Sequence, residues 1–65
     1  MKASELRDLS DEELGQRYRE TRRELFNLRM QKASGQIEKP ARIPEVRRTV
    51  ARILTIQQER AGAAR

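Results

Sequence analysis

Apolar residues recur at helical spacing over residues 11 to 34. The stripe consists of Leu14, Tyr18, Thr21, Leu25 and Leu28. Steps of four, three, four and three keep one narrow line of side chains facing a partner helix. Ser10 followed by Glu13 has the pattern of a capping box, which starts a helix at the next residue. Ser34 and Gly35 suit the turn just past a helix end, so these signals predict a long helix over residues 11 to 34.

A second stripe with the same spacing follows in the C-terminal half. It consists of Ile43, Val46, Val50, Ile53 and Gln57. Leu54 is expected to widen this stripe, whereas Ile56 is expected to lie exposed on its flank. The pattern predicts a second amphipathic helix that would pack against the first.

Two prolines make the start of the second helix ambiguous. Pro40 suits the first position of a helix. If the helix began there, however, Pro44 would remove a hydrogen bond of the first turn and crowd the preceding carbonyl. The helix is therefore expected to begin at residue 40 or 44 and to run to about residue 60. Residues 61 to 65 lack an apolar anchor and are expected to fray.

Together the stripes predict an all-α fold, an antiparallel two-helix coiled-coil hairpin with a short N-terminal helical turn. A loop of residues 35 to 39 is short enough to make the two long helices antiparallel neighbours. Residues 4 to 9 are expected to form the short helix, with Leu6 and Leu9 folding onto the longer ones. The whole chain, residues 1 to 65, is expected to be a single domain.

Composition excludes several classes of protein. The chain has no cysteine and no histidine, so disulfide-stapled folds, thiolate nucleophiles, zinc knuckles and the usual near-neutral acid–base group are ruled out. No serine has a catalytic partner, and no glycine-rich phosphate loop or metal-ligand spacing occurs. We expect no enzyme, no cofactor, no metal site and no small-molecule substrate. No apolar stretch approaches the roughly 18 residues that span a bilayer, so we expect a cytoplasmic protein without a membrane partner.

Charge points to nucleic acid as the partner. Lys and Arg number 15 against 10 Asp and Glu, for a net charge of +5, and 12 of the 15 cations are Arg. The planar guanidinium matches phosphate geometry and stacks on bases. Aromatic residues make up only 3% of the chain, which is too few for a single-strand stacking platform. Folded RNA recognised by shape and backbone contacts fits better.

One face of the first long helix, beside its stripe, combines cations with apolar side chains. This face holds Arg19, Arg22, Phe26, Arg29, Met30 and Ala33. One interpretation is a contact surface, on which arginines hold phosphates while Phe26 and Met30 pack against sugar, base or protein. The other is that Phe26 caps one end of the core and the arginines are merely solvated.

The second helix and the bend offer further cations. Arg47, Arg48 and Arg52 have no acidic residue between Glu45 and Glu59 to neutralise them. They could form either a solvated basic face or a phosphate clamp. Four cations are expected to converge at the bend, namely Arg29, Lys32, Lys39 and Arg42.

Several segments resemble a family of large-subunit ribosomal proteins, the L-twenty-nine family. The resemblance covers residues 1 to about 60 and rests on residues 9–14, 24–31, 34–36, 42–48 and 50–52. Its most specific parts are the Phe-Asn-Leu-Arg sequence at 26–29 and the Val-Arg-Arg and Ala-Arg sequences at 46–48 and 51–52. Pro44 and Gly15 depart from the pattern, since a better helix former would be usual at both positions.

The resemblance implies a helical hairpin on the large-subunit (23S) rRNA, beside the nascent-peptide exit. It also implies a neighbouring protein of the L-twenty-three family, near the place where chaperones and the signal recognition particle approach. Combined with the charge pattern, it gives a set of candidate RNA-binding residues. The set is Arg19, Arg22, Phe26, Asn27, Arg29, Lys32, Gly35, Gln36, Arg42, Arg47, Arg48 and Arg52.

The predicted function is therefore that of a structural constituent of the large ribosomal subunit. An alternative is a homodimeric helical bundle or a protein-binding adaptor, with Phe26 and Met30 in the interface. RNA binding should weaken steeply with salt because several phosphates are neutralised. A bundle held by apolar contacts should tolerate salt.

Overall fold

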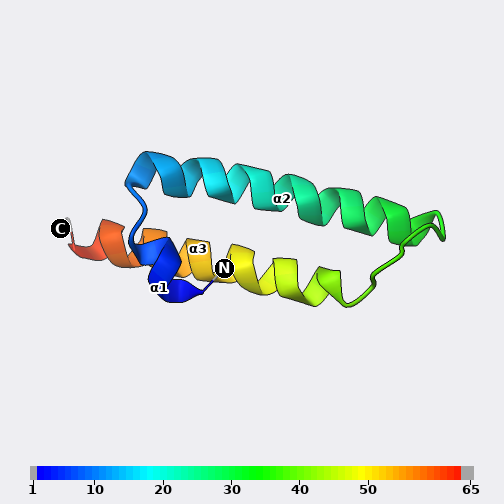
Figure 1. Cartoon of the computed structure of the whole chain (residues 1–65). Helices are drawn as coiled ribbons and strands as arrows, with labels where there is room; N and C mark the ends of the chain where they lie inside the picture. Colours follow the sequence, from blue (N-terminus) through cyan, green and yellow to red (C-terminus); the bar gives the residue numbers. More distant parts are fainter. Residues whose placement is uncertain (1, 64–65) are drawn as a thin grey trace.

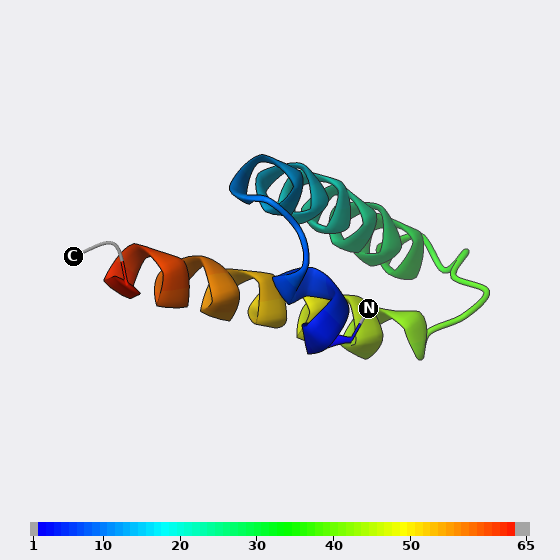
Figure 2. The ribbon, with the colours of Figure 1, turned by 60° about the vertical axis from the view of Figure 1, so that its left-hand side comes forward.

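Three helices make up most of the molecule (Figure 1). The computed structural model describes residues 2–63, in which α1 spans Ala3–Arg7, α2 spans Asp11–Ala33 and α3 spans Arg42–Ala63. α2 and α3 lie antiparallel in a rod of 45 × 17 × 16 Å, and α1 packs against α3 (Figures 1 and 2). No strand occurs among the described residues. The predicted all-α hairpin with a short N-terminal helix is confirmed.

α2 begins at the predicted capping box. The Glu13 backbone N–H donates to Ser10 Oγ at 3.1 Å, and the Ser10 backbone N–H donates to Glu13 Oε1 at 3.3 Å. Each side chain thus satisfies a backbone donor that the first turn of a helix leaves without a partner.

α2 ends in a Schellman motif. The Gln36 N–H donates to the Gln31 carbonyl at 2.8 Å, and the Gly35 N–H donates to the Lys32 carbonyl at 3.1 Å. Gly35 has a φ of +75°, a conformation that costs glycine little because it has no Cβ. The last helical residue is Ala33, one residue before the predicted end.

α3 starts at Arg42, between the two predicted starts. Its entry is a turn in which the Arg42 N–H donates to the Lys39 carbonyl at 3.0 Å and the Ile43 N–H to the Pro40 carbonyl at 3.2 Å. Pro44 is thus the third helical residue, where a backbone N–H has no helical acceptor in any case, so its ring interrupts no hydrogen bond.

The end of α3 also differs from the expectation. Residues 61 to 63 are helical rather than frayed, and 64 and 65 lie outside the described residues. Ala61 and Ala63 favour helix strongly enough to carry the last turn without an apolar anchor.

The two stripes form the interface between α2 and α3. Its buried residues are Leu14, Thr21 and Leu25 from α2 and Val46, Val50 and Ile53 from α3. The expectation for Ile56 was wrong, because this side chain is only 2% exposed. It packs with Leu6 of α1 in one apolar cluster, to which Leu9 and Tyr18 also contribute. Leu54, expected to widen the stripe, is 40% exposed.

A single arginine holds the corner between α1 and α2. Arg60 of α3 donates from Nη2 to the carbonyls of Arg7 and Leu9, at 3.1 and 2.7 Å, and from Nη1 to Asp11 Oδ1 at 2.8 Å. Carbonyls at the end of a short helix lack helical donors. The guanidinium supplies these donors and thereby fixes α1 on α3.

Removing this guanidinium should release α1. We expect Arg60→Ala to lower the free energy of unfolding by about 1–3 kcal/mol, because charge-assisted hydrogen bonds are lost and carbonyls lose their donors. Urea denaturation measures the loss, and hydrogen exchange should show faster exchange in α1 than in α2. Arg17→Ala is the matched control. Its ion pair with Glu20 is exposed and spans 3.7 Å, so its loss should cost well under 1 kcal/mol.

Substitution by alanine should change the stability of the chain in opposite directions at Gly15, inside α2, and at Gly35, just after α2. A Cβ on Gly15 would meet only Arg19 Nη1, at an ordinary 3.5 Å, so Gly15→Ala should stabilise the chain by about 1 kcal/mol. Gly35→Ala places a Cβ on a residue with φ of +75° and should destabilise it by roughly 1 kcal/mol. Thermal or urea unfolding of the two variants tests both signs. A stability loss in Gly15→Ala would contradict the first.

Candidate nucleic-acid interface

α1 occupies one long side of the hairpin (Figure 2). Ile56 lies beneath it and marks that side of α3. Arg42, fourteen residues earlier and thus almost four whole turns away, lies on nearly the same side. It contacts Glu24, with Nη2 at 2.9 Å from Oε1, so Glu24 marks the same side on α2. We call this the α1 side.

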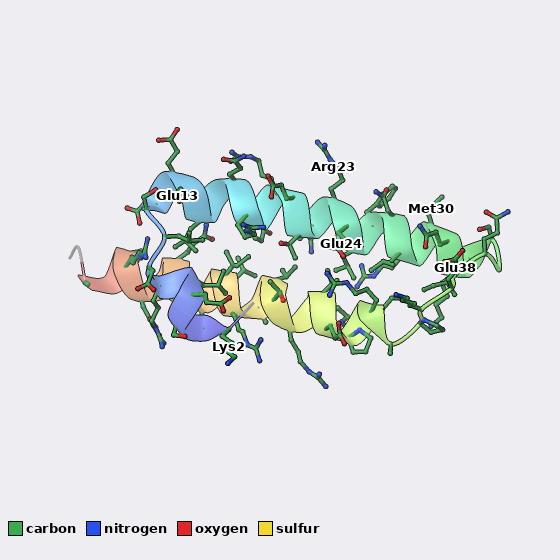
Figure 3. The ribbon with its side chains drawn as sticks, in the orientation of Figure 1. Lys2, Glu13, Arg23, Glu24, Met30 and Glu38 are labelled. Atoms are coloured by element: carbon green, nitrogen blue, oxygen red, sulfur yellow. The ribbon has the colours of Figure 1, made fainter. Side chains whose placement is uncertain are left out.

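The opposite side gathers most of the predicted face. Arg47 precedes Ile56 by nine residues and Arg22 precedes Glu24 by two, which at about 100° per residue places both roughly opposite the α1 side. Figure 3 shows Glu24 pointing toward α3 and the preceding residue, Arg23, pointing away from it. Five residues of α2 and one of α3 define this basic face. They are Arg19, Arg22, Phe26, Arg29, Met30 and Arg47.

Carboxylates of the molecule form ion pairs with arginines outside the basic face. Ion pairs of the described residues include Arg7–Glu59 at 3.3 Å, Arg17–Glu20 at 3.7 Å, Arg42–Glu24 at 2.9 Å, Arg42–Glu45 at 3.1 Å and Arg60–Asp11 at 2.8 Å. Within residues 2–63, no arginine of the basic face takes part in an ion pair. Among the described residues, no carboxylate therefore lies within ion-pair distance of the positive charges of this face.

Arg42 has a different environment from these arginines. The hydrogen bond from its guanidinium to Glu45, and to a smaller extent the one to Glu24, raise the pKa of Arg42 above its usual value, so Arg42 stays cationic. Its Nε also donates to Glu24 Oε1 at 2.9 Å. Arg42 thus joins the start of α3 to α2, and much of its charge is compensated within the fold.

Apolar side chains lie within the basic face. Phe26 is 63% exposed and Met30 is 56% exposed. They are four residues apart and are therefore neighbours on α2. The interpretation of Phe26 as a cap of the core is wrong, since most of its ring is open to solvent. The exposed pair instead gives the cationic surface an apolar centre.

The remaining candidates lie elsewhere on the molecule, and all of them are exposed. Asn27 borders a hollow with Glu20 and Glu24, toward the α1 side. Lys32, Gly35 and Gln36 belong to the bend. Arg48 and Arg52 lie on the back of α3, beside a small hollow that Arg42, Glu45 and Thr49 complete.

The bend carries a wide hollow. Its volume is about 880 Å³, and it is lined by Leu28, Gln31, Gln36, Glu38, Lys39, Arg42 and Glu45. Only Gln36 and Arg42 of the predicted residues border it. Its two carboxylates balance its two cations, so it is less suited to a polyanion than the basic face.

Sequence reasoning missed Arg60, because its acceptors come from α1 and from the start of α2, about fifty residues away. The one sequence feature that places Arg60 on the packed side of α3 is its position three residues after Gln57, the last residue of the second stripe. The described residues contain no cluster of acidic side chains suited to a metal ion. Among them, too, no helix is long and apolar enough to cross a membrane.

Comparison with known proteins matches residues 4–60 to the family described as Ribosomal L29 protein. A relative from Caldanaerobacter subterraneus subsp. tengcongensis, named large ribosomal subunit protein uL29, is 58% identical over 60 residues, which cover 92% of this chain and 91% of the relative. A protein of the same name from Rubrobacter xylanophilus is 55% identical, over 92% of this chain and 90% of its own length. Another from Streptomyces griseus subsp. griseus is 56% identical, over 91% of this chain and 80% of its own length.

Stability measurements should separate paired from unpaired arginines. Replacing Arg22, Arg29 or Arg47 singly with alanine should change the free energy of unfolding by no more than about 0.5 kcal/mol, since exposed residues without partners contribute little. Arg42→Ala should destabilise the chain more than any of these, because two carboxylates lose their donor. Urea midpoints at low salt test the order. A large loss in Arg29→Ala would show that this side chain has a structural contact.

Proposed function

Because the chain belongs to the ribosomal L29 protein family, we propose that it binds large-subunit (23S) rRNA through its basic face. The family consists of structural proteins of the large ribosomal subunit, and it is not a family of enzymes. The chain accordingly works in the ribosome of the cytoplasm and performs no chemistry. The observation that supports the RNA contact is the side opposite α1, where arginines of both long helices lack carboxylate partners.

Electrostatic attraction between arginines and phosphates is the main contribution to binding. Guanidinium groups of Arg19, Arg22, Arg29 and Arg47 hold phosphates, and the counterions that those phosphates release favour association. The rigid hairpin sets the spacing of these groups, so RNA of a matching shape is preferred over other polyanions. Lys32, Gly35 and Gln36 extend the contact around the bend, whereas Arg48 and Arg52, on the back of α3, face a second segment of the RNA.

We propose from the family membership that the hairpin lies beside the nascent-peptide exit. A protein of the L-twenty-three family is the proposed neighbour there, and factors that act on nascent chains approach nearby. The α1 side suits a protein contact better than an RNA contact, because its cations are already paired with carboxylates. Asn27 and Arg42 lie toward that side.

The alternative of a homodimeric bundle finds less support. Both apolar stripes are already buried within a single chain, since Leu14, Leu25, Val50 and Ile53 pack between α2 and α3. A second copy would have to dock on Phe26 and Met30, where the surrounding arginines of both copies would repel one another.

Single charge reversals should map the contact. Arg29→Glu and Arg47→Glu should each weaken binding to 23S rRNA at least about 10-fold, because a phosphate contact is lost and a repulsion is added. Each should also reduce the slope of log K against log salt by about 1. Arg17→Glu is the control, with the same change of charge on the α1 side. Filter binding at several salt concentrations measures the affinities, and circular dichroism checks helicity.

Two results would contradict the proposal. One is equal loss of affinity in Arg17→Glu and Arg29→Glu, which would show that only net charge matters. The other is a wild-type chain that ignores 23S rRNA at low salt but sediments as a dimer.

A further inference from the structure

Phe26 lies between two arginines along one side of α2, and neither arginine takes part in an ion pair. Arg22 precedes it by four residues and Arg29 follows it by three, so all three share one side of α2. Met30 follows by four residues and adds a second apolar group. With Phe26 63% exposed and Met30 56% exposed, the fold leaves this apolar area uncovered in the middle of its most cationic surface.

Charge alone does not account for a phenyl ring at this place. Phosphate and ribose of a regular RNA duplex are polar, and its base faces are hidden in the stack. A duplex that touched Arg22 and Arg29 would dehydrate the ring without giving it an apolar partner. An unstacked base, by contrast, offers a flat face to an aromatic side chain, and the two stack favourably.

The spacing along α2 fits one nucleotide. Arg22 and Arg29 are seven residues apart, or about 10 Å along the axis at 1.5 Å per residue. Their long side chains can therefore reach the phosphates on either side of a base that lies on Phe26. Tyr18, the other aromatic residue, packs against the apolar cluster around Leu14 and Ile53, so no second ring is free to continue a stack.

We infer that the basic face receives a single unstacked nucleotide of the rRNA, a bulged or loop base that stacks on Phe26. Arg22 and Arg29 hold its flanking phosphates, and Met30 covers one edge of the base. Arg19 and Arg47 contact phosphates of the adjoining duplex. This inference rests on the proposed function, since it names the RNA feature that the proposed interface recognises.

The test uses the full chain and purified 23S rRNA. Phe26→Leu keeps an apolar side chain but removes the flat ring, whereas Phe26→Trp keeps a ring. Leu54→Ala is the control, because Leu54 is another exposed apolar residue, 40% exposed, on α3. Phe26→Leu should weaken binding by about 10-fold or more, the usual effect of losing one stacked base. Phe26→Trp and Leu54→Ala should bind as the wild type does.

Salt dependence separates stacking from charge. Phe26→Leu removes no phosphate contact, so the slope of log K against log salt should equal that of the wild type. Arg29→Ala should reduce that slope by about 1. Chemical probing of unpaired bases should reveal one nucleotide that the wild type and Phe26→Trp protect and that Phe26→Leu leaves reactive.

Each other outcome has a definite meaning. Wild-type affinity and protection with Phe26→Leu would overturn the inference but leave the proposed RNA binding intact. If that variant also failed to enter large subunits, Phe26 would be a protein contact instead. Equal losses in Phe26→Leu and Leu54→Ala would likewise overturn stacking. A wild-type chain that does not bind 23S rRNA would refute the proposed function itself.

Discussion

The packing of α1 against α3 determines which surface of the hairpin is left for a partner. Two antiparallel helices alone would expose two long sides. Five residues of α1 cover one of them by placing Leu6 on Ile56, and Arg60 fixes their position through two backbone carbonyls and Asp11. Because this side is occupied, only the opposite side remains continuous along both α2 and α3. The short helix contributes little area, but it makes the hairpin asymmetric.

The same asymmetry divides the arginines into two groups. Those near the α1 side find carboxylates, as the pairs Arg42–Glu24 and Arg7–Glu59 show. Exposed ion pairs of this kind add little stability each. Their larger effect is on the distribution of charge, because they cancel positive charge where the chain packs on itself and leave it uncancelled on the basic face. In a chain with a net charge of +5, four arginines without an ion pair thereby lie together on the basic face.

Local signals were enough to predict the helices. A capping box, a glycine at positive φ and two apolar stripes act within one helical turn or along one helix, so Ser10, Gly35 and the stripe residues could be assigned from spacing. Ile56 and Arg60 could not, because their partners in α1 are about fifty residues away in sequence. The grouping of Arg22, Phe26 and Arg29 followed from one helix, whereas the alignment of Arg47 with them depends on how α3 docks. For the same reason the pairing of Arg42 with Glu24 could not be foreseen.

A small core makes the exposure of Phe26 informative. Leu, Ile, Val and Phe together supply only 13 of 65 residues, and full burial of a Phe side chain would contribute about 1.5–3 kcal/mol to folding. The fold nonetheless directs Phe26 and Met30 outward and buries Thr21 in the interface, where its hydroxyl is satisfied by the Arg17 carbonyl at 2.7 Å. A partner that covers Phe26 recovers the missing apolar contact and, since it binds only the folded hairpin, shifts the folding equilibrium toward that form. On the proposed binding, stability and recognition are therefore coupled through the same surface.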